Sequence, residues 1–333
     1  MKSIVLIIPY FGPFRPDFKF WLKSVSKNPT IDFLLLTDNA VKSAPHNLKV
    51  VQTTFAELKN KIQRAFNFDI CLSQPYKLCD FRPCYGEVFA DLIKDYDFWG
   101  YTDMDMVYGD ICHFIKEEML VSYDRILGLG HFSLFRNTPK INSMYKSVEQ
   151  PSYRQVFTFP CGCAFDEYWG LSRYMDKNMH DKFYQAYPFD DVDRMKYPFH
   201  AQMRRHEDVG KRNFIYAYEN GKLYRIYEYQ GKLCKDETMY VHFQKRSMEI
   251  RTDVSDYFMM IPNSYVPYIQ NLTLDKLRSF SVENKCYPHA YELQWKRIAD
   301  KWKKVKASFR CSKFGTPQLP KDGMKYYIED KTK

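Results

Sequence analysis

Short apolar runs alternate with helical patterns along the first third of the chain. Ile4–Ile8 and Ile31–Thr37 are apolar runs bounded by turn residues, as expected for buried parallel strands. Between them, Asp17–Ser26 places its apolar side chains three or four residues apart, which is the spacing of one helix face. Leu48–Val51 and Phe55–Phe66 continue the alternation with a strand and a helix. This order predicts an α/β fold in which helices cover both faces of a mostly parallel central sheet.

The alternation continues in the next stretch of the chain. Tyr85–Ile93 predicts a helix, and Tyr96–Thr102 predicts a strand. Arg125–Leu129 predicts a further strand, and Pro139–Val148 a helix. Residues 150–210 are rich in Tyr, Phe, Pro and Asp, and their pattern assigns no element.

A hairpin and a short strand are predicted beyond this region. Phe214–Tyr218 and Leu223–Tyr229 are strand-like runs on either side of an Asn220-Gly221 turn, a pair that favours tight hairpins. Met239–Phe243 predicts one more short strand.

The composition is that of a globular protein. The 333 residues are 45% hydrophobic and 27% charged, which excludes a disordered or fibrous chain. No run of 18 apolar residues occurs, so no membrane-spanning helix is predicted. Because neither a repeat nor a low-complexity linker divides the chain, we expect one main domain over residues 1–270 and a helical appendage over residues 271–333.

The N-terminus and the cysteines favour a cytoplasmic location. Ile4–Ile8 is too short an apolar run for a secretion signal, and no small-residue cleavage site follows it. The nine cysteines are odd in number and form no pair of zinc knuckles. We therefore expect all of them to be reduced thiols.

Positive charge is concentrated near the C-terminus. The net charge of +10 suits nucleic acid, an anionic membrane surface or a phosphate-bearing substrate. Residues 291–310 carry seven basic and two acidic side chains, a net of +5. Apolar side chains recur there three or four residues apart, which predicts a basic amphipathic helix that lies either on an anionic membrane or against the main domain. The apolar positions are Tyr291, Trp295, Ile298, Trp302, Val305 and Phe309, and the basic positions are Lys296, Arg297, Lys301, Lys303, Lys304, Lys306 and Arg310.

Two carboxylates follow the predicted strand Tyr96–Thr102. Asp103 and Asp105 are separated by one residue, so in an extended chain both point to the same side. Mg²⁺ and Mn²⁺ favour such oxygen ligands, and α/β sheets bind ligands at the carboxyl ends of their strands. The pair therefore predicts a divalent-metal site, with solvated loop acids as the alternative.

Seven segments in order carry a resemblance to a known family. They are Ile8–Gly12, Leu36–Asn39, Tyr76–Pro83, Tyr101–Asp105, Gly130–Asn137, Phe165–Glu167 and Tyr240–Lys245. Together they resemble the metal-dependent glycosyltransferases of the GT-A fold, most closely the enzymes of bacterial capsule, exopolysaccharide or lipopolysaccharide synthesis. The resemblance covers about residues 1–250. It implies a GT-A-like, Rossmann-like sheet, a Mn²⁺ or Mg²⁺ ion and a nucleotide-sugar donor, which we expect to be a UDP-sugar. The acceptor would be a glycan or a lipid-linked oligosaccharide at the inner face of the cytoplasmic membrane.

The resemblance also implies where the nucleoside binds. The residues that would border the base and ribose are Pro9, Tyr10, Phe11 and Gly12, with Thr37 and Asp38 at the base edge or ribose. An aromatic ring beside a glycine offers a stacking face and close backbone approach. The alternative is that the two aromatic residues belong to the core and that the aspartate forms a turn.

Three charged residues would lie near the diphosphate. By resemblance Lys77 and Arg82 would neutralise phosphate, and Asp80 would hold the ribose or the donor sugar. A surface ion-pair cluster is the alternative. Asp103 would contact the nucleotide as well as the metal.

Four further residues receive roles from the resemblance near the metal and the donor sugar. His242 would be a third metal ligand, and Lys245 would bind the departing diphosphate. Asp166 and Glu167 would act at the sugar, as a base if the reaction inverts the anomeric centre or by steadying positive charge if it retains configuration. The alternative for Asp166 is an N-cap of a helix over Tyr168–Met175.

Three further places in the chain are also considered. His131, Arg136 and Asn137 would by resemblance line the sugar and acceptor side. The acidic segment Asp190–Asp193 is interpreted as a solvated loop, and His206–Asp208 is a further candidate site.

Two other functions compete with the glycosyltransferase prediction. A metal-dependent nucleotidyltransferase or phosphohydrolase would use the same acidic pair. A non-catalytic nucleic-acid-binding protein would use the positive charge, although the chain carries no recognised nucleic-acid motif. No P-loop, GxGxxG or GxSxG sequence occurs.

Overall fold

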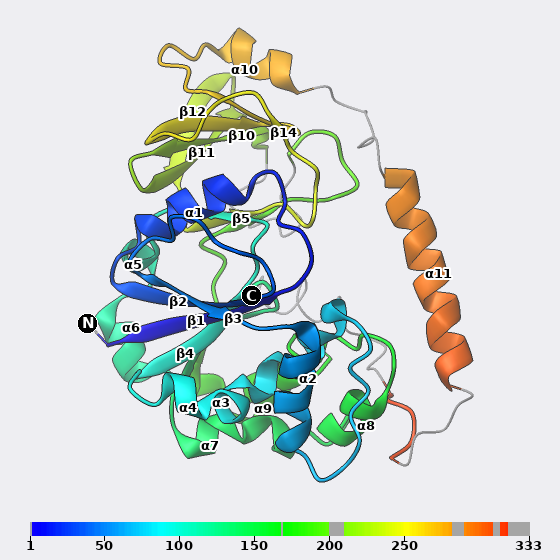
Figure 1. Cartoon of the computed structure of the whole chain (residues 1–333). Coiled ribbons are helices and arrows are strands. Elements are labelled where there is room, and N and C mark those ends of the chain that lie inside the picture. Colours follow the sequence, from blue (N-terminus) through cyan, green and yellow to red (C-terminus); the bar gives the residue numbers. More distant parts are fainter. Residues whose placement is uncertain (1, 168, 200–209, 282–289, 309–313, 319–333) are drawn as a thin grey trace.

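The computed structural model describes residues 2–167, 169–199, 210–281, 290–308 and 314–318. This part of the chain forms two larger sheets and a three-stranded sheet, with helices around them (Figure 1). The α/β class predicted from the sequence is confirmed.

The main sheet has seven strands in the order β3-β2-β1-β4-β7-β6-β8. Neighbouring strands are parallel except that β7 is antiparallel to both β4 and β6. The mostly parallel sheet is therefore confirmed. The strands are β1 (Ile4–Tyr10), β2 (Ile31–Thr37), β3 (Leu48–Gln52), β4 (Phe98–Thr102), β6 (Arg125–Leu129), β7 (Phe132–Arg136) and β8 (Phe183–Tyr184).

Successive residues of the central strands pack on opposite faces of this sheet. In β1, Ile7 belongs to the hydrophobic cluster that includes helix α2 (Phe55–Arg64), whereas Leu6 belongs to the cluster that includes α1 (Phe18–Ser26). Figure 1 accordingly draws α1 and α2 on opposite sides of the sheet. Because both faces of the sheet are covered, the sequences of these strands are continuous apolar runs rather than alternating apolar and polar residues.

The predicted helix Tyr85–Ile93 is interrupted in the structure. It forms α3 (Tyr85–Val88) and α4 (Ala90–Ile93), because Phe89 between them has φ −109° and ψ 21°, outside the helical region. The segment before it, Pro75–Cys84, is a 3₁₀ helix, η1, that the sequence pattern did not indicate.

The predicted helix over 139–148 is also two short pieces. They are α7 (Pro139–Asn142) and the 3₁₀ helix η2 (Met144–Ser147). The other helices of this region are α5 (Ile111–Phe114), α6 (Glu117–Ser122), α8 (Tyr153–Thr158), α9 (Leu171–Asn178) and the 3₁₀ helix η3 (His180–Lys182).

A three-stranded sheet lies beside the carboxyl end of β4. Its order is β5-β13-β9, with β5 (Met106–Tyr108) antiparallel and β9 (Asp190–Asp191) parallel to β13 (Tyr240–His242). It joins three segments that are far apart in the sequence, and all three contribute to the site described below.

The second large sheet has six strands in the order β12-β11-β10-β15-β16-β14. The predicted hairpin is confirmed: β10 and β11 are joined by Asn220 and Gly221, whose φ angles of 47° and 93° suit a tight turn. Helix α10 (Leu274–Phe280) packs on this sheet through Leu277. The strands are β10 (Arg212–Glu219), β11 (Lys222–Tyr229), β12 (Lys232–Glu237), β14 (Glu249–Ile250), β15 (Tyr257–Ile261) and β16 (Ser264–Pro267).

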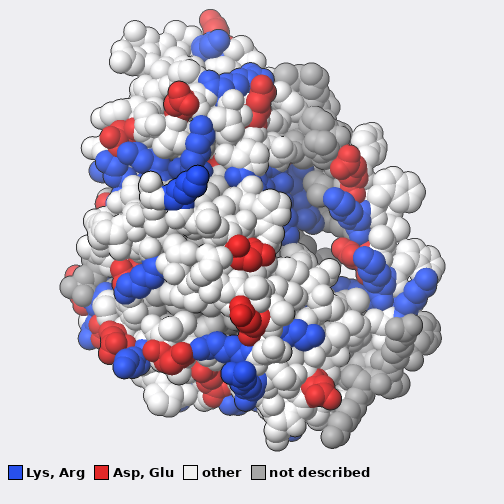
Figure 2. All heavy atoms as spheres, viewed as in Figure 1, with Lys and Arg blue, Asp and Glu red and all other residues white. Residues whose placement is uncertain are grey.

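The predicted basic helix is present as α11 (Ala290–Ser308), drawn to one side of the main body in Figure 1. Most of its apolar stripe is exposed, since Trp295 and Trp302 are 71% and 63% accessible, whereas Ala307 near its end is buried in the hydrophobic cluster that includes α2. Figure 2 shows basic side chains along this helix and a hollow between it and the body. Phe309 and Arg310 lie outside the described residues. No described helix is both long and apolar enough to cross a membrane.

The cysteines that the structure describes are free thiols, as predicted. They are Cys71, Cys79, Cys84, Cys112, Cys161, Cys163 and Cys234. Cys286 and Cys311 lie outside the described residues, and the division of the chain at residue 270 stays a prediction.

Candidate active site

The site lies where β1, β2 and β4 end, because parallel neighbouring strands end at the same edge of the sheet. The segment after β4 is held from both sides. The backbone N–H of Asp103 donates to the carbonyl of His131, 3.1 Å away in the β6–β7 turn. The carbonyl of Asp105 accepts from the N–H of Phe243, 2.9 Å away after β13. The sheet therefore fixes both predicted metal-binding carboxylates.

Asp103, Asp105 and His242 form a compact group. One potential ligand atom from each lies within 4.8 Å of the others. His242 Nε2 is 3.3 Å from Asp105 Oδ1 and 3.8 Å from Asp103 Oδ2. Two carboxylates and an imidazole are a suitable donor set for Mn²⁺ or Mg²⁺, so these residues fit the ion that the sequence predicts.

Hydrogen-bond donors of the chain contact both carboxylates. Arg82 Nη2 donates to Asp103 Oδ1, and the backbone N–H of Lys245 donates to Asp105 Oδ2. Burial opposes ionisation of Asp105, but the adjacent His242, together with Arg15 and the Lys245 N–H, outweighs burial and holds the pKa of Asp105 well below its usual range. Asp105 is therefore ionised at neutral pH and available as a cation ligand.

Asp166 and Glu167 form a buried acid pair beside this group. Asp166 Oδ2 lies 3.1 Å from Arg82 Nη1, so one guanidinium contacts both Asp103 and Asp166. Glu167 Oε1 accepts from the N–H of Gly130 at 2.9 Å. A Cβ at position 130 would lie 2.3 Å from that oxygen, so a larger residue there would displace the Glu167 carboxylate.

Burial changes the acidity of this pair. It raises the pKa of Asp166 to about 8 and also raises the pKa of Glu167. The alternative role of Asp166 as a helix cap is wrong, because α9 begins at Leu171 with Gly170 at its N-cap position. A buried carboxyl of raised pKa next to a candidate metal site suits proton transfer or charge stabilisation.

The pKa of Asp166 predicts a pH-dependent stability difference. An unfolded aspartate has a pKa of about 3.9, so between about pH 4 and pH 8 the folded protein retains a proton that the unfolded chain releases. Stability due to this group therefore falls as pH rises through that window. Asp166→Asn has no carboxyl that titrates, so this group no longer makes stability depend on pH. The free energy of unfolding of the variant minus that of the wild type should therefore be larger at pH 8 than at pH 5. Urea unfolding at both pH values measures this, and a difference independent of pH would contradict it.

The predicted nucleoside-binding residues lie at the same edge. Asp38 Oδ1 accepts from the N–H of Gly12 at 3.2 Å, and Asn39 Nδ2 donates to the Gly12 carbonyl at 2.7 Å, so the loops after β1 and β2 are tied together. Thr37 is buried and its hydroxyl accepts from Asn39. The exposed carboxylate of Asp38 thus lies beside the loop that follows β1.

The residues of the first of these loops are half-buried. Pro9 pairs with Leu36 in the sheet, and Tyr10 donates to the carbonyl of Pro13 at 3.0 Å. Phe11 contacts Phe55 edge to face, with ring centroids 5.6 Å apart. Both aromatic rings therefore contact the core while retaining an accessible part at the site edge.

Lys77 and Asp80 have a different place from the one predicted. They form an ion pair of 2.6 Å in which both side chains are 1% accessible. Lys77 Nζ also donates to the carbonyls of Val156 and Cys161, which occupies all three of its hydrogens. Asp80 accepts from the backbone N–H groups of Cys163 and Phe165. The pair anchors the segment that carries Asp166. Of the three residues predicted near the diphosphate, Arg82 is the one that contacts Asp103 and Asp166.

Arg136 and Asn137 lie at the opposite end of the sheet from Asp103. Because β7 is antiparallel to β4, Phe132 pairs with Thr102 at the site, but Arg136 pairs with Phe98 at the far end. Arg136 pairs with Asp124 at 2.7 Å, and Asn137 donates to the carbonyls of Ile93 and Tyr96. The structure does not bring them to the site.

His131 and Lys245 do reach the site. His131 is buried in the β6–β7 turn, its Nδ1 lies 2.9 Å from the Tyr240 hydroxyl, and its ring centroid is 4.6 Å from that of His242. Burial lowers the pKa of His131 to about 4, so it is neutral at pH 7. The Nζ of Lys245 lies 3.8 Å from the ring centroid of Tyr76, an exposed side chain.

Comparison with known proteins assigns a family. The model of DUF6625, described as a family of unknown function, matches residues 6–269. The chain belongs to this family. No curated protein matches the chain.

Two solved structures of glycosyltransferases are similar to parts of the chain. Galactosyltransferase LgtC in complex with donor and acceptor sugar analogs is 12% identical with a TM-score of 0.27, and the match covers 43% of this chain and 63% of LgtC, less than two thirds of it. Mouse xyloside xylosyltransferase 1 in its apo form is 8% identical with a TM-score of 0.30, and the match covers 58% of this chain and 88% of that one. At values this low, neither likeness assigns an activity.

Asp191 is a site residue that sequence reasoning missed. The segment Asp190–Asp193 was expected to be a solvated loop, but that prediction is wrong for Asp190 and Asp191, which form β9 and are buried. Asp191 Oδ1 lies 2.8 Å from His242 Nδ1. No apolar run signals β9, because its burial comes from β13 and β11, which lie far along the chain. The candidate site His206–Asp208 lies outside the described residues.

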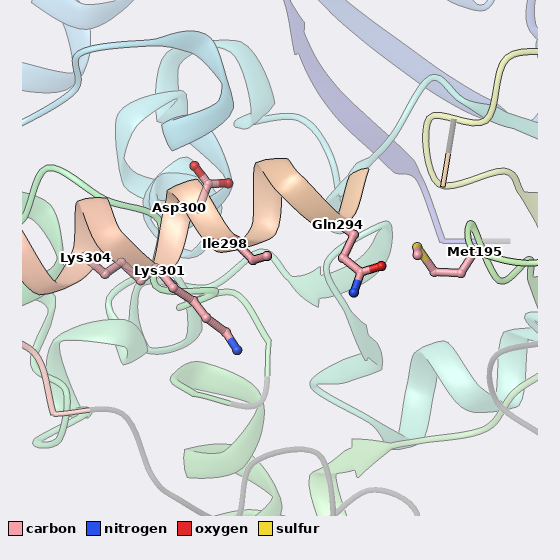
Figure 3. Close-up of a pocket in the computed structure, with 6 residues that line it drawn as sticks. All are labelled: Met195, Gln294, Ile298, Asp300, Lys301 and Lys304. Atoms are coloured by element: carbon pink, nitrogen blue, oxygen red, sulfur yellow. The ribbon is translucent and has the colours of Figure 1, made fainter. Parts of the chain in front are cut away.

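One cavity in the described part of the chain is separate from the group of Asp103, Asp105 and His242. It has a volume of about 570 Å³ and lies between α11 and the loop after β9. Figure 3 shows Met195 of that loop opposite Gln294 of α11, with Lys301 extending from the same helix. None of the residues that line it belongs to the candidate metal site or to the acid pair, so we do not assign the active site to this cavity.

Proposed function

We propose that the protein is a metal-dependent glycosyltransferase of the GT-A type that transfers a sugar from a nucleotide diphosphate sugar. The observation that carries the proposal is the group of Asp103, Asp105 and His242, whose potential ligand atoms lie within 4.8 Å of one another at the carboxyl edge of a mostly parallel sheet. The ordered sequence resemblance over residues 1–250 supports the same activity. The donor would be a UDP-sugar, and the acceptor a glycan or a lipid-linked oligosaccharide of bacterial surface polysaccharide synthesis.

The three residues of this group would hold Mn²⁺ or Mg²⁺. When bound, the ion would neutralise charge that develops on the diphosphate leaving group. Lys245 would add positive charge on the leaving-group side, since its backbone N–H donates to Asp105 Oδ2. Tyr10, Phe11 and Asp38 would then border the nucleoside, in the loops tied together by Gly12.

The buried acids would act at the sugar. Arg82 contacts both Asp103 and Asp166, so it would orient the acid pair relative to the leaving group. A pKa of about 8 keeps Asp166 mostly protonated at neutral pH, so it would accept a proton from an acceptor hydroxyl, or steady positive charge at the anomeric carbon, in the ionised fraction that grows as the pH rises toward 8. His131, neutral and buried, would border the sugar from the β6–β7 turn.

Product analysis tests this function. The protein is incubated with Mn²⁺ and a panel of UDP-sugars, with and without glycan acceptors, and the nucleotides are separated by anion-exchange chromatography. The proposal predicts release of UDP for at least one donor. Release of UMP, pyrophosphate or inorganic phosphate in its place would favour a nucleotidyltransferase or phosphohydrolase and contradict the proposal.

We also infer that α11 contacts the inner face of an anionic cytoplasmic membrane. Trp295 and Trp302 are exposed on a helix rich in lysine, and each basic residue near an anionic surface adds on the order of 1 kcal/mol. The protein should co-sediment with vesicles containing phosphatidylglycerol at low salt, and the double variant Trp295→Ser, Trp302→Ser should lose most of this binding. Vesicles of neutral phosphatidylcholine are the control. Equal sedimentation of both proteins would contradict the inference.

A further inference from the structure

His242 approaches the two carboxylates with a defined ring orientation. Its Nε2 is the atom that lies 3.3 Å from Asp105 and 3.8 Å from Asp103. Its other nitrogen, Nδ1, lies 2.8 Å from Asp191 Oδ1. Since an imidazole has two ring nitrogens, a hydrogen bond from Nδ1 to a carboxylate leaves Nε2 as the atom that can bind a cation.

We propose that Asp191 is a positioning residue that holds His242 in the orientation needed to bind the metal. This inference rests on the proposed function, in which Asp103, Asp105 and His242 hold the ion. Asp191 would not touch the ion or the substrate. It would act by fixing which nitrogen of His242 faces the two carboxylates.

The backbone fixes Asp191 opposite His242. In the parallel pairing of β9 with β13, Asp191 is in register with His242 and Asp190 with Val241. The N–H of Val192 donates to the carbonyl of His242 at 2.9 Å, which holds the end of this pairing. The contact between the two side chains is therefore set by a sheet rather than by a loop, and rigid elements position site residues most accurately.

The two adjacent aspartates have separate partners. Successive residues of a strand point to opposite faces, so Asp190 points away from Asp191. Asp190 pairs with Arg225 of β11 at 3.0 Å, and both are buried. Asp190 thus joins the second large sheet to this region, which leaves Asp191 as the carboxylate that faces the site.

Gln244 holds the other oxygen of Asp191. Its Nε2 donates to Asp191 Oδ2 at 2.7 Å, so both carboxylate oxygens have donors. Gln244 and Lys245 have φ angles of 47° and 64°, a region that residues other than glycine enter at a cost. This turn lets the Gln244 side chain reach Asp191 while the Lys245 N–H reaches Asp105. The strained turn therefore supports the metal-binding carboxylate and the positioning carboxylate together.

Manganese binding measures the proposed role directly. Free Mn²⁺ is followed by its EPR signal during titration of the wild type, Asp191→Asn and Asp191→Ala. Loss of a hydrogen-bond partner behind a histidine ligand typically lowers metal affinity about 10- to 100-fold. Asp191→Ala should lie near the upper end of this range. Asp191→Asn should lie near the lower end, because its carbonyl oxygen can still accept from His242 but carries no charge. Asp253→Asn, at a fully exposed side chain, is the charge-matched control and should bind like the wild type.

The outcomes separate this inference from the proposed function. Wild-type affinity in folded Asp191→Ala would overturn the positioning role. If Asp191→Ala does not fold, wild-type affinity in Asp191→Asn overturns it, and weakened affinity there supports it. A wild-type protein that binds no Mn²⁺ would instead contradict the metal site of the proposed function. Equal weakening in Asp253→Asn would show a general effect of charge and would also overturn the positioning role.

Discussion

Asp103→Asn should lower sugar transfer by about 10³-fold or more while the protein stays folded. Metal-ion stabilisation of a leaving group contributes several kcal/mol, and each 1.36 kcal/mol is a tenfold change in rate. An amide is a poorer ligand for a hard cation than a carboxylate. Arg82, which contacts Asp103, keeps Asp166 and the carbonyl of Gly130 as acceptors, so the variant leaves no unpaired guanidinium.

Steady-state transfer rates and thermal unfolding of the same samples check this result. Asp253→Asn removes the same charge from an exposed position and should keep both wild-type activity and wild-type stability. Wild-type turnover in Asp103→Asn would contradict the assignment of the metal to this carboxylate. A large fall in the unfolding temperature would mean that the residue serves the fold instead.

Lys77→Met should destabilise the protein by about 3–5 kcal/mol, the usual cost of leaving one partner of a buried ion pair without the other. Asp80 keeps its two backbone donors, but its charge loses the ammonium group 2.6 Å away. The carbonyls of Val156 and Cys161 lose a donor as well.

Urea unfolding of Lys77→Met beside Lys61→Met gives a matched comparison. Lys61 pairs with Asp91 at 2.8 Å on the surface, and such exposed pairs contribute about 0–1 kcal/mol. The free energy of unfolding should therefore fall much more in Lys77→Met than in Lys61→Met. Equal effects of the two substitutions would show that Lys77 is not the structural anchor inferred here.

The sequence predicted those parts of the fold whose burial follows from their own residues. β2 has the predicted bounds because a continuous apolar run is buried on both faces, whichever segments of the chain supply the elements that cover it. β6 has the predicted bounds for the same reason. The helix predicted over 85–93 was interrupted at Phe89, since the apolar spacing does not report the backbone angles of a single residue.

The sequence predicted the position of a site residue only where a local pattern of residues indicates it. Asp103 and Asp105 follow an apolar strand, so their place at the sheet edge could be inferred. The place of Asp191 could not be inferred, because it becomes part of the site through β13 and Gln244, about 50 residues later in the chain. Arg136 was predicted to line the site but lies far from Asp103. The reason is that β7 is antiparallel to β4, and the sequence did not reveal that direction.

The central claim is that nucleotide-sugar binding depends on a divalent ion at Asp103, Asp105 and His242. A thermal-shift panel of nucleotide sugars with and without Mn²⁺ tests it most directly, because a ligand that binds the folded state raises the unfolding temperature. The claim predicts that at least one nucleotide sugar raises the unfolding temperature only when Mn²⁺ is present. A shift of equal size without Mn²⁺, or no shift with any donor, would contradict it.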